Sequence, residues 1–175
     1  MKHGLQVEKD ALGQIIIDKP ATPGYASKPL TIFQAHMDMV CVCEEGVEYD
    51  PMTDPIKVIN DGEMLTADGT SLGADDGIGI AIALYVLGDN TLRHGPIRAI
   101  FTVNEEGMDS INMDAKYLQG DYLVNLDWEE IGSICNSCAG GDFFVFSRKT
   151  DWEAAPVGVQ TMTISFSNLL GGHSG

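Results

Sequence analysis

Apolar residues in this chain fall into short runs typical of strands and one longer run typical of a helix. The segment "QIIID" (residues 14–18) follows the turn-forming Gly13 and predicts a strand, and "LTIFQAH" (residues 30–36) predicts a second one. Two apolar runs within residues 54–70 flank the dipeptide Asp61-Gly62, which predicts a hairpin. The first third of the chain is therefore expected to be rich in strands.

The middle of the chain predicts helices between further strands. The run "DGIGIAIALYVLGD" (residues 76–89) is apolar on nearly all faces, so we expect a buried helix that ends at Gly88. The run "IRAIFTV" (residues 97–103) is almost continuously apolar, which indicates a strand covered on both faces. A short helix at residues 113–118 and a strand at 122–127 follow. This order predicts an α/β fold with a mixed, largely parallel central sheet flanked by helices.

The character of the chain changes after residue 146. The stretch "RKTDWEAAPVG" is polar and contains proline, and "VQTMTISFSNLLGG" (residues 159–172) alternates like a strand with one exposed face. We therefore expect a domain boundary near residues 147–156, with one domain at 1–150 and the beginning of another at 151–175.

Composition narrows the classes of partner. The chain of 175 residues has 26 acidic and 10 basic residues and a formal charge of −16. This charge disfavours nucleic acid and anionic membranes as partners and is compatible with cation binding. The start "MKHGLQVEKD" lacks the apolar core of a signal peptide, and the longest apolar run (residues 77–88) is too short to cross a bilayer. A cytoplasmic protein is expected.

The four cysteines form two close pairs, Cys41 with Cys43 and Cys135 with Cys138. A zinc site with four cysteine ligands is one interpretation, but the spacing C-x-C is unusual for such a site. Free thiols are expected.

Acidic and imidazole side chains follow several of the predicted strands. His36 and Asp38 end one strand, Glu105 and Glu106 end another, Asp127 ends a third, and Asp75 and Asp76 open the long helix. In open α/β sheets these positions meet at one edge, where ligands bind. So many carboxylates around one imidazole favour a divalent cation such as Zn²⁺, Mn²⁺ or Co²⁺. A merely solvated acidic rim is the alternative.

The spacing of His36 and Asp38, and that of Glu105 and Glu106, predicts a different role for each residue of the pair. His36 and Asp38 lie two residues apart on an extended strand, so Asp38 can orient the imidazole. The neighbouring Glu105 and Glu106 must diverge, so one can bind a metal while the other faces the water on it. No EF-hand, phosphate-binding loop, H-E-x-x-H motif or nucleophile elbow is present.

Five ordered motifs resemble those of aminoacyl-histidine dipeptidases, carnosinase-like members of the dizinc aminoacylase and carboxypeptidase superfamily. The motifs are "AHMDMV", "GTSLGADDGIGIA", "TVNEEGMD", "NLDWEEIGSICNSCAGG" and "LLGGHSG". The resemblance implies a zinc-exopeptidase-like catalytic domain, truncated at the start of a lid and dimerisation domain. It also implies a hydrolase that cleaves dipeptides, especially Xaa-His. The expected cofactors are two divalent metals, Zn²⁺ first, with Mn²⁺ or Co²⁺ as alternatives.

The resemblance implies a role for each matching residue. His36 and Asp127 would bind the first metal, Glu106 the second, and Asp75 would bridge both, next to a cis peptide bond with Asp76. The catalytic residues would be Asp38, which orients His36; Glu105, the general base; and His173, which stabilises the transition state from the lid.

Members of this family are much longer than 175 residues, and a later His ligand of the second metal has no counterpart here. The resemblance therefore implies an N-terminal fragment that is inactive as a protease alone, while the full-length protein would form a homodimer and act on small peptides. A tripeptidase, an aminoacylase, a desuccinylase or a non-catalytic metal-binding descendant shares the same motifs.

Overall fold

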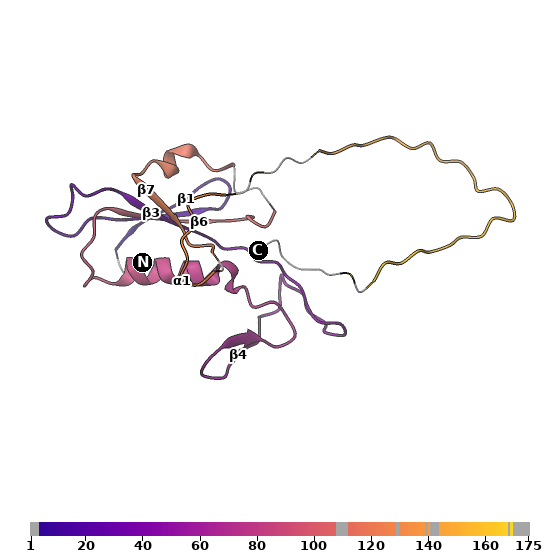
Figure 1. Cartoon of the computed structure of the whole chain (residues 1–175), viewed down its shortest axis with the longest axis horizontal. Helices are drawn as coiled ribbons and strands as arrows, with labels where there is room; N and C mark the ends of the chain where they lie inside the picture. The colour runs from indigo at the N-terminus through magenta and orange to yellow at the C-terminus, as the bar shows by residue number, and fades with distance from the viewer. Residues whose placement is uncertain are drawn as a thin grey trace. The chain divides into compact units, whose positions relative to one another are not determined.

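The computed structural model describes residues 4–107, 112–128, 130–138, 140, 144–167 and 169. The chain divides into two units, Met1–Trp128 and Glu129–Gly175. The named helices and strands of the described residues all belong to the first unit (Figure 1). The boundary expected near residues 147–156 lies inside the second unit and, like the two domains expected on either side of it, stays a prediction.

A five-stranded mixed sheet forms the centre of the first unit. Its order is β1 (Gln6–Lys9), β2 (Ile15–Lys19), β6 (Ile97–Thr102), β3 (Thr31–His36) and β7 (Tyr122–Asn125). Strand β3 pairs in parallel with β6 and β7, whereas β2 pairs antiparallel with β1 and β6. Only β2 runs against the other strands. The predicted mixed, largely parallel sheet of an α/β fold is thereby confirmed.

Helix α1 (Ala74–Gly88) covers one face of this sheet. Ala83 and Leu87 of the helix pack on Ala35, Ala99 and Phe101 of β3 and β6. Alanine on both elements lets the helix backbone come close to the strands, and this packing removes apolar surface from water.

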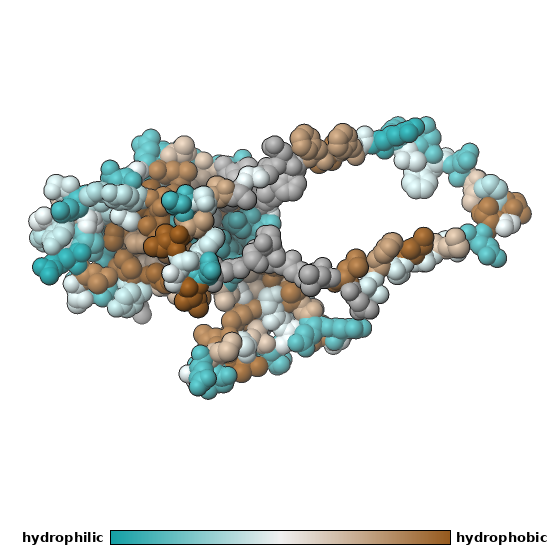
Figure 2. Space-filling view, in the orientation of Figure 1, coloured by the Kyte–Doolittle hydropathy of each residue, from teal (hydrophilic) through white to brown (hydrophobic). Residues whose placement is uncertain are grey.

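The outer side of α1 differs from the prediction that the helix is buried on nearly all faces. Ile78, Ile82 and Tyr85 are exposed, with 46–68% of their surface accessible. The sheet contacts only one side of α1, through a stripe of residues at helical spacing, and within the described residues nothing covers the opposite side. Apolar side chains are also visible among polar ones on the surface of this unit in Figure 2.

The other face of the sheet has a smaller core. Ile16, Ile32 and Ile100 pack there with Tyr117 of the 3₁₀ helix η2 (Ala115–Leu118). The short helix expected at residues 113–118 is therefore present as a 3₁₀ turn. Because β6 contributes to both cores, its almost continuous apolar sequence is explained, as predicted, by cover on both faces.

The predicted hairpin is confirmed as β4 (Val58–Asn60) and β5 (Leu65–Ala67). Its turn holds because the Asp61 side chain accepts hydrogen bonds from the backbone N–H groups of Glu63 and Met64, while Gly62 has a φ of 96°. The hairpin forms a two-stranded sheet of its own and contributes no strand to the main sheet. The antiparallel strand of the main sheet is β2.

The second unit has no helix or strand among its described residues. The strand expected at residues 159–172 is thus not observed at 159–167 or 169. A strand requires a hydrogen-bonding neighbour, and the part of the chain that is described offers it none. No helix among the described residues is long and apolar enough to span a bilayer.

Candidate metal centre

The candidate site lies where three parallel strands end and α1 begins. His36 is the last residue of β3 and lies in register with Thr102, the last residue of β6. Glu105 and Glu106 follow β6, Asp127 follows β7, and Asp75 stands in the first turn of α1. The parallel register brings these chain segments to one edge of the sheet, as predicted.

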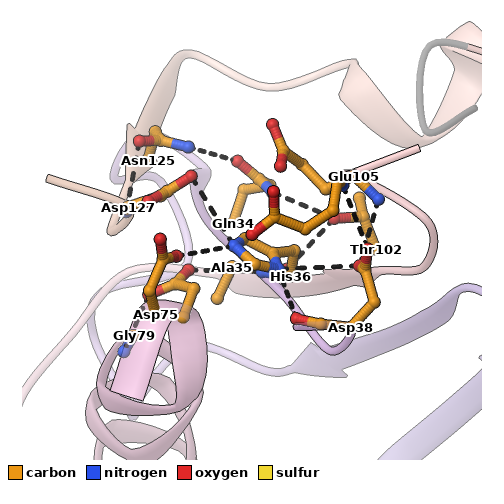
Figure 3. A network of polar contacts seen from close by, with 12 residues as sticks. Gln34, Ala35, His36, Asp38, Asp75, Gly79, Thr102, Glu105, Asn125 and Asp127 are labelled. Carbon is orange, nitrogen blue, oxygen red and sulfur yellow. Dashed lines mark hydrogen bonds and ion pairs between the residues drawn. The ribbon is translucent and has the colours of Figure 1, made fainter. Parts of the chain in front are cut away.

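The imidazole of His36 is the centre of this arrangement (Figure 3). Its Nε2 atom lies 2.8 Å from Asp75 Oδ1 and 3.9 Å from Asp127 Oδ2. Its Nδ1 atom lies 2.8 Å from the backbone carbonyl oxygen of Asp38. Only 1% of the His36 side chain is exposed, so these contacts hold the ring in a water-poor environment.

The contact with Asp38 fixes the proton on the imidazole. A carbonyl oxygen can only accept a hydrogen bond, so Nδ1 must carry hydrogen and Nε2 faces the carboxylates. In the absence of a cation, Nε2 also carries a hydrogen and donates a hydrogen bond to Asp75 Oδ1 at 2.8 Å. The same atom can bind a metal when that proton leaves, because the Nδ1–H···O bond already holds the ring in the required orientation.

Two overlapping groups of side chains have the composition of a metal site. One contains His36, Asp75 and Asp127, and the other contains His36, Glu105 and Glu106; within each group the potential ligand atoms lie within 4.8 Å of one another. Imidazole nitrogen and carboxylate oxygen are suitable ligands for Zn²⁺ and similar ions. This donor set fits a divalent cation.

Charge crowding in this site alters its titration. Burial raises the pKa of Asp127 above 3.8, and the negative charge of Asp75 raises it further. Burial likewise raises the pKa of Glu105 above 4.5, with added repulsion from Asp127 and Glu106. For His36, burial lowers the pKa, but the hydrogen bonds to Asp75 and Asp38 outweigh it, so the pKa lies above 6.5. A cation would relieve this repulsion.

Asp76 is a structural part of the site, with 4% of its surface exposed. Its carboxylate accepts hydrogen bonds from the backbone N–H of His36 at 3.2 Å and of Gly79 at 3.1 Å. It therefore joins the end of β3 to the first turn of α1. The Asp75–Asp76 peptide bond is cis, as the family resemblance implied. No sequence pattern distinguishes this buried carboxylate from the partly exposed Asp75 beside it.

A row of uncharged polar side chains crosses the sheet beside the acidic groups. The amide of Asn125 donates to Gln34 Oε1, and Gln34 donates to Thr102 Oγ1 at 3.2 Å. These residues, with Glu105 and Asp127, line a cavity of about 270 Å³ whose other walls are apolar. Sequence reasoning missed this row, because single polar residues within strands gave no distinctive pattern.

The other residues singled out in the sequence are His173 and the four cysteines. His173 lies outside the described residues. Cys41, Cys43, Cys135 and Cys138 are exposed free thiols, as expected. In the described residues, the side-chain groups with metal-site geometry contain no cysteine.

This α/β domain, with an imidazole among carboxylates at the carboxyl edge of its sheet, resembles dipeptidases in sequence and structure. The chain is 44% identical over 176 residues to the cytosol non-specific dipeptidase of Escherichia coli (strain K12), a match that covers 99% of this chain and 36% of that protein. The resemblance to dipeptidases found in the motifs is thereby confirmed. No family model matches the chain.

Two solved structures support the same relationship. The aminoacylhistidine dipeptidase of Vibrio alginolyticus matches with a TM-score of 0.70 and 43% identity, over 75% of this chain and 27% of that one. The aminopeptidase PepT of Bacillus cereus ATCC 10987 matches with a TM-score of 0.57 and 26% identity, over 74% of this chain and 35% of that one. The chain spans 36% of the length of the Escherichia coli dipeptidase, about a third.

Proposed function

We propose that this chain supplies the metal-holding part of a cytoplasmic metallopeptidase that cleaves dipeptides, Xaa-His dipeptides among them. The observation that carries the proposal is the convergence of four carboxylates on the single imidazole of His36. The sequence similarity to a dipeptidase over 99% of the chain supports the choice of peptide as the substrate.

The donor groups divide between two cations in this proposal. His36, Asp75 and Asp127 would hold the first ion, and Asp75 and Glu106 would hold the second, as the family resemblance implies, with Zn²⁺ as the preferred metal. Asp75 Oδ1 lies 2.8 Å from His36 Nε2, and 39% of the Asp75 side chain is exposed, so its carboxylate would be accessible to a cation. The bound ions would supply an activated water molecule and polarise the peptide carbonyl group.

Glu105 acts as the general base in this scheme. It lines the 270 Å³ cavity together with Asp127, so a peptide in that cavity lies next to both side chains. Burial raises the pKa of Glu105 and makes it a stronger proton acceptor than an exposed glutamate. Glu105 takes the proton from the attacking water and delivers it to the leaving amine, and His173 stabilises the developing negative charge.

A peptidase of different specificity is the second candidate, favoured by the structural similarity to PepT. Both candidates act on small peptides, and in both we propose a homodimer for the complete gene product.

The proposal is tested by assaying the complete gene product, loaded with Zn²⁺ or Mn²⁺, on dipeptides with and without a C-terminal histidine, on tripeptides and on N-acyl amino acids. We expect hydrolysis of dipeptides, and a loss of kcat on Glu105→Gln while metal binding is retained. Asp61→Asn, a change at an exposed carboxylate in the turn of the separate β4–β5 sheet, is the control.

Preferred cleavage of tripeptides would favour the PepT-like candidate. Metal binding without hydrolysis of any substrate would contradict the enzyme and leave a non-catalytic metal-binding protein.

A further inference from the structure

The backbone and the side chain of Asp38 contact different parts of the site. The imidazole Nδ1 of His36 lies 2.8 Å from the Asp38 carbonyl oxygen but 3.5 Å from its carboxylate Oδ1. The backbone carbonyl is therefore the principal partner of the ring. Every substitution of Asp38 keeps that carbonyl, so we expect the imidazole to keep its orientation when the carboxylate is removed.

The carboxylate of Asp38 has two other partners. Its Oδ1 accepts a hydrogen bond from the backbone N–H of Glu105 at 3.0 Å, and its Oδ2 accepts one from the backbone N–H of Glu106 at 3.0 Å. Each oxygen thus binds one peptide group of the same turn. Hydrogen bonds to an ionised acceptor are stronger than neutral ones, so this pair is a substantial restraint.

The turn that Asp38 holds has an unusual backbone. Asn104 has a φ of 55°, in the left-handed region that asparagine tolerates better than most residues. A Cβ atom on Gly107 would lie 2.2 Å from Asn104 Oδ1, so the turn closes tightly on the Asn104 side chain. Glu105 and Glu106 lie between these two positions, and the direction of their peptide groups sets where their side chains point.

We propose that Asp38 is the positioning residue of the Glu105–Glu106 turn. Through the two peptide N–H groups, its carboxylate determines where the proposed general base and the proposed ligand of the second metal stand. Both side chains bring a ligand atom within 4.8 Å of His36, which requires such control because adjacent like charges repel. The functional meaning of this assignment rests on the proposed function, but the contact itself does not.

Two substitutions separate the roles of the side chain. Asp38→Ala removes both acceptors and leaves the carbonyl that holds His36. Asp38→Asn keeps the shape but offers one oxygen and one NH₂ group, so it can accept from only one of the two peptides and places a donor against the other. Asp114→Ala is the control, since that aspartate also accepts a backbone N–H, from Lys116, at an exposed position.

The experiment is amide hydrogen exchange by NMR on the metal-free chain, with the ring nitrogen shifts of His36 recorded on the same samples. In Asp38→Ala we expect exchange at the Glu105 and Glu106 amides to rise about 10- to 100-fold, the range for loss of a hydrogen bond to a charged group, while the His36 ring shifts stay unchanged. In Asp38→Asn only one of the two amides should accelerate. Should Asp38→Ala fail to fold, the Asp38→Asn result decides alone.

Unchanged protection of both amides in Asp38→Asn would overturn the proposal. A change in the His36 ring shifts with unaltered amides would overturn it as well, because the carboxylate would then act through the imidazole. Neither measurement uses metal or substrate, so failure here leaves the proposed peptidase function standing, and failure of the peptidase assay leaves this assignment standing.

Discussion

Replacement of Asp76 by alanine is expected to destabilise the chain and to weaken metal binding together. The Asp76 carboxylate accepts the buried N–H groups of His36 and Gly79, and its removal leaves both donors without that partner. Gly79 lies three residues after Asp76, so the same change also removes the cap of the regular part of α1.

The size of the effect follows from these two contacts. A buried N–H group without a partner costs about 1–3 kcal/mol, so two of them cost about 2–6 kcal/mol. Burial raises the pKa of Asp76, which means that the native state also carries an unfavourable buried charge. Removing that charge returns part of the loss, and the expected net decrease in unfolding free energy is about 2–4 kcal/mol.

Urea denaturation of the metal-free chain, followed by circular dichroism, measures the change in unfolding free energy. The dependence of this free energy on urea concentration (the m-value) should be the same in both proteins. Calorimetric titration with Zn²⁺ provides the second measurement. Asp76 fixes both the end of β3 and the start of α1, which carry two ligands, so we expect about a 10- to 100-fold loss of affinity.

The control is Asp114→Ala, which removes the exposed cap of η2 and should cost no more than about 1 kcal/mol. A change below about 1 kcal/mol for Asp76→Ala, similar to that of the control, would show that these two buried contacts do not hold the site together.

Three further predictions concern the titration of the site, the core and the end of α1. The pKa values of Asp127, Glu105 and His36 lie above 3.8, 4.5 and 6.5, respectively. Each group therefore binds its proton more tightly in the folded than in the unfolded chain. Its contribution to the stability of the metal-free chain should decrease as the pH rises from about 4 to above 6.5. Asp127→Asn should make this decrease smaller in urea titrations at several pH values; an unchanged or larger decrease would count against the crowded site. Ile100 is fully buried, and Ile100→Ala should lower the unfolding free energy by about 2–5 kcal/mol, whereas a loss below about 1 kcal/mol would argue against the second core. Lys19 is 6% exposed and donates to two carbonyl groups at the end of α1, so Lys19→Met should lower the melting temperature, and an equal or higher value would contradict the capping role.

The elements with an unambiguous pattern could be predicted from the sequence. Strand β6 could be identified because its apolar residues contact both cores, and the hairpin could be identified because Asp61-Gly62 has the chemistry of a tight turn. The convergence of His36, Asp75 and Asp127 followed from a general property of parallel sheets, whose strands end at one edge.

Other features depend on tertiary contacts that the local sequence does not encode. Strand β1 was not predicted, since it is a four-residue edge strand whose residues are all exposed, and it therefore has no buried periodic pattern. The apolar sequence of α1 does not reveal that Ile78 and Tyr85 face outward. Spacing placed Asp38 beside His36, but it could not show that the Asp38 carboxylate binds the peptide groups of Glu105 and Glu106.

We propose that the carboxylates gathered around His36 hold a divalent cation. The decisive experiment is an anomalous diffraction map, recorded at the zinc absorption edge, of crystals of this chain grown with Zn²⁺. We expect a zinc peak about 2.0–2.2 Å from His36 Nε2 and from carboxylate oxygens of Asp75 and Asp127. Zinc bound only elsewhere, for example at Cys41 and Cys43, or no zinc at all, would show that these carboxylates do not form a metal site.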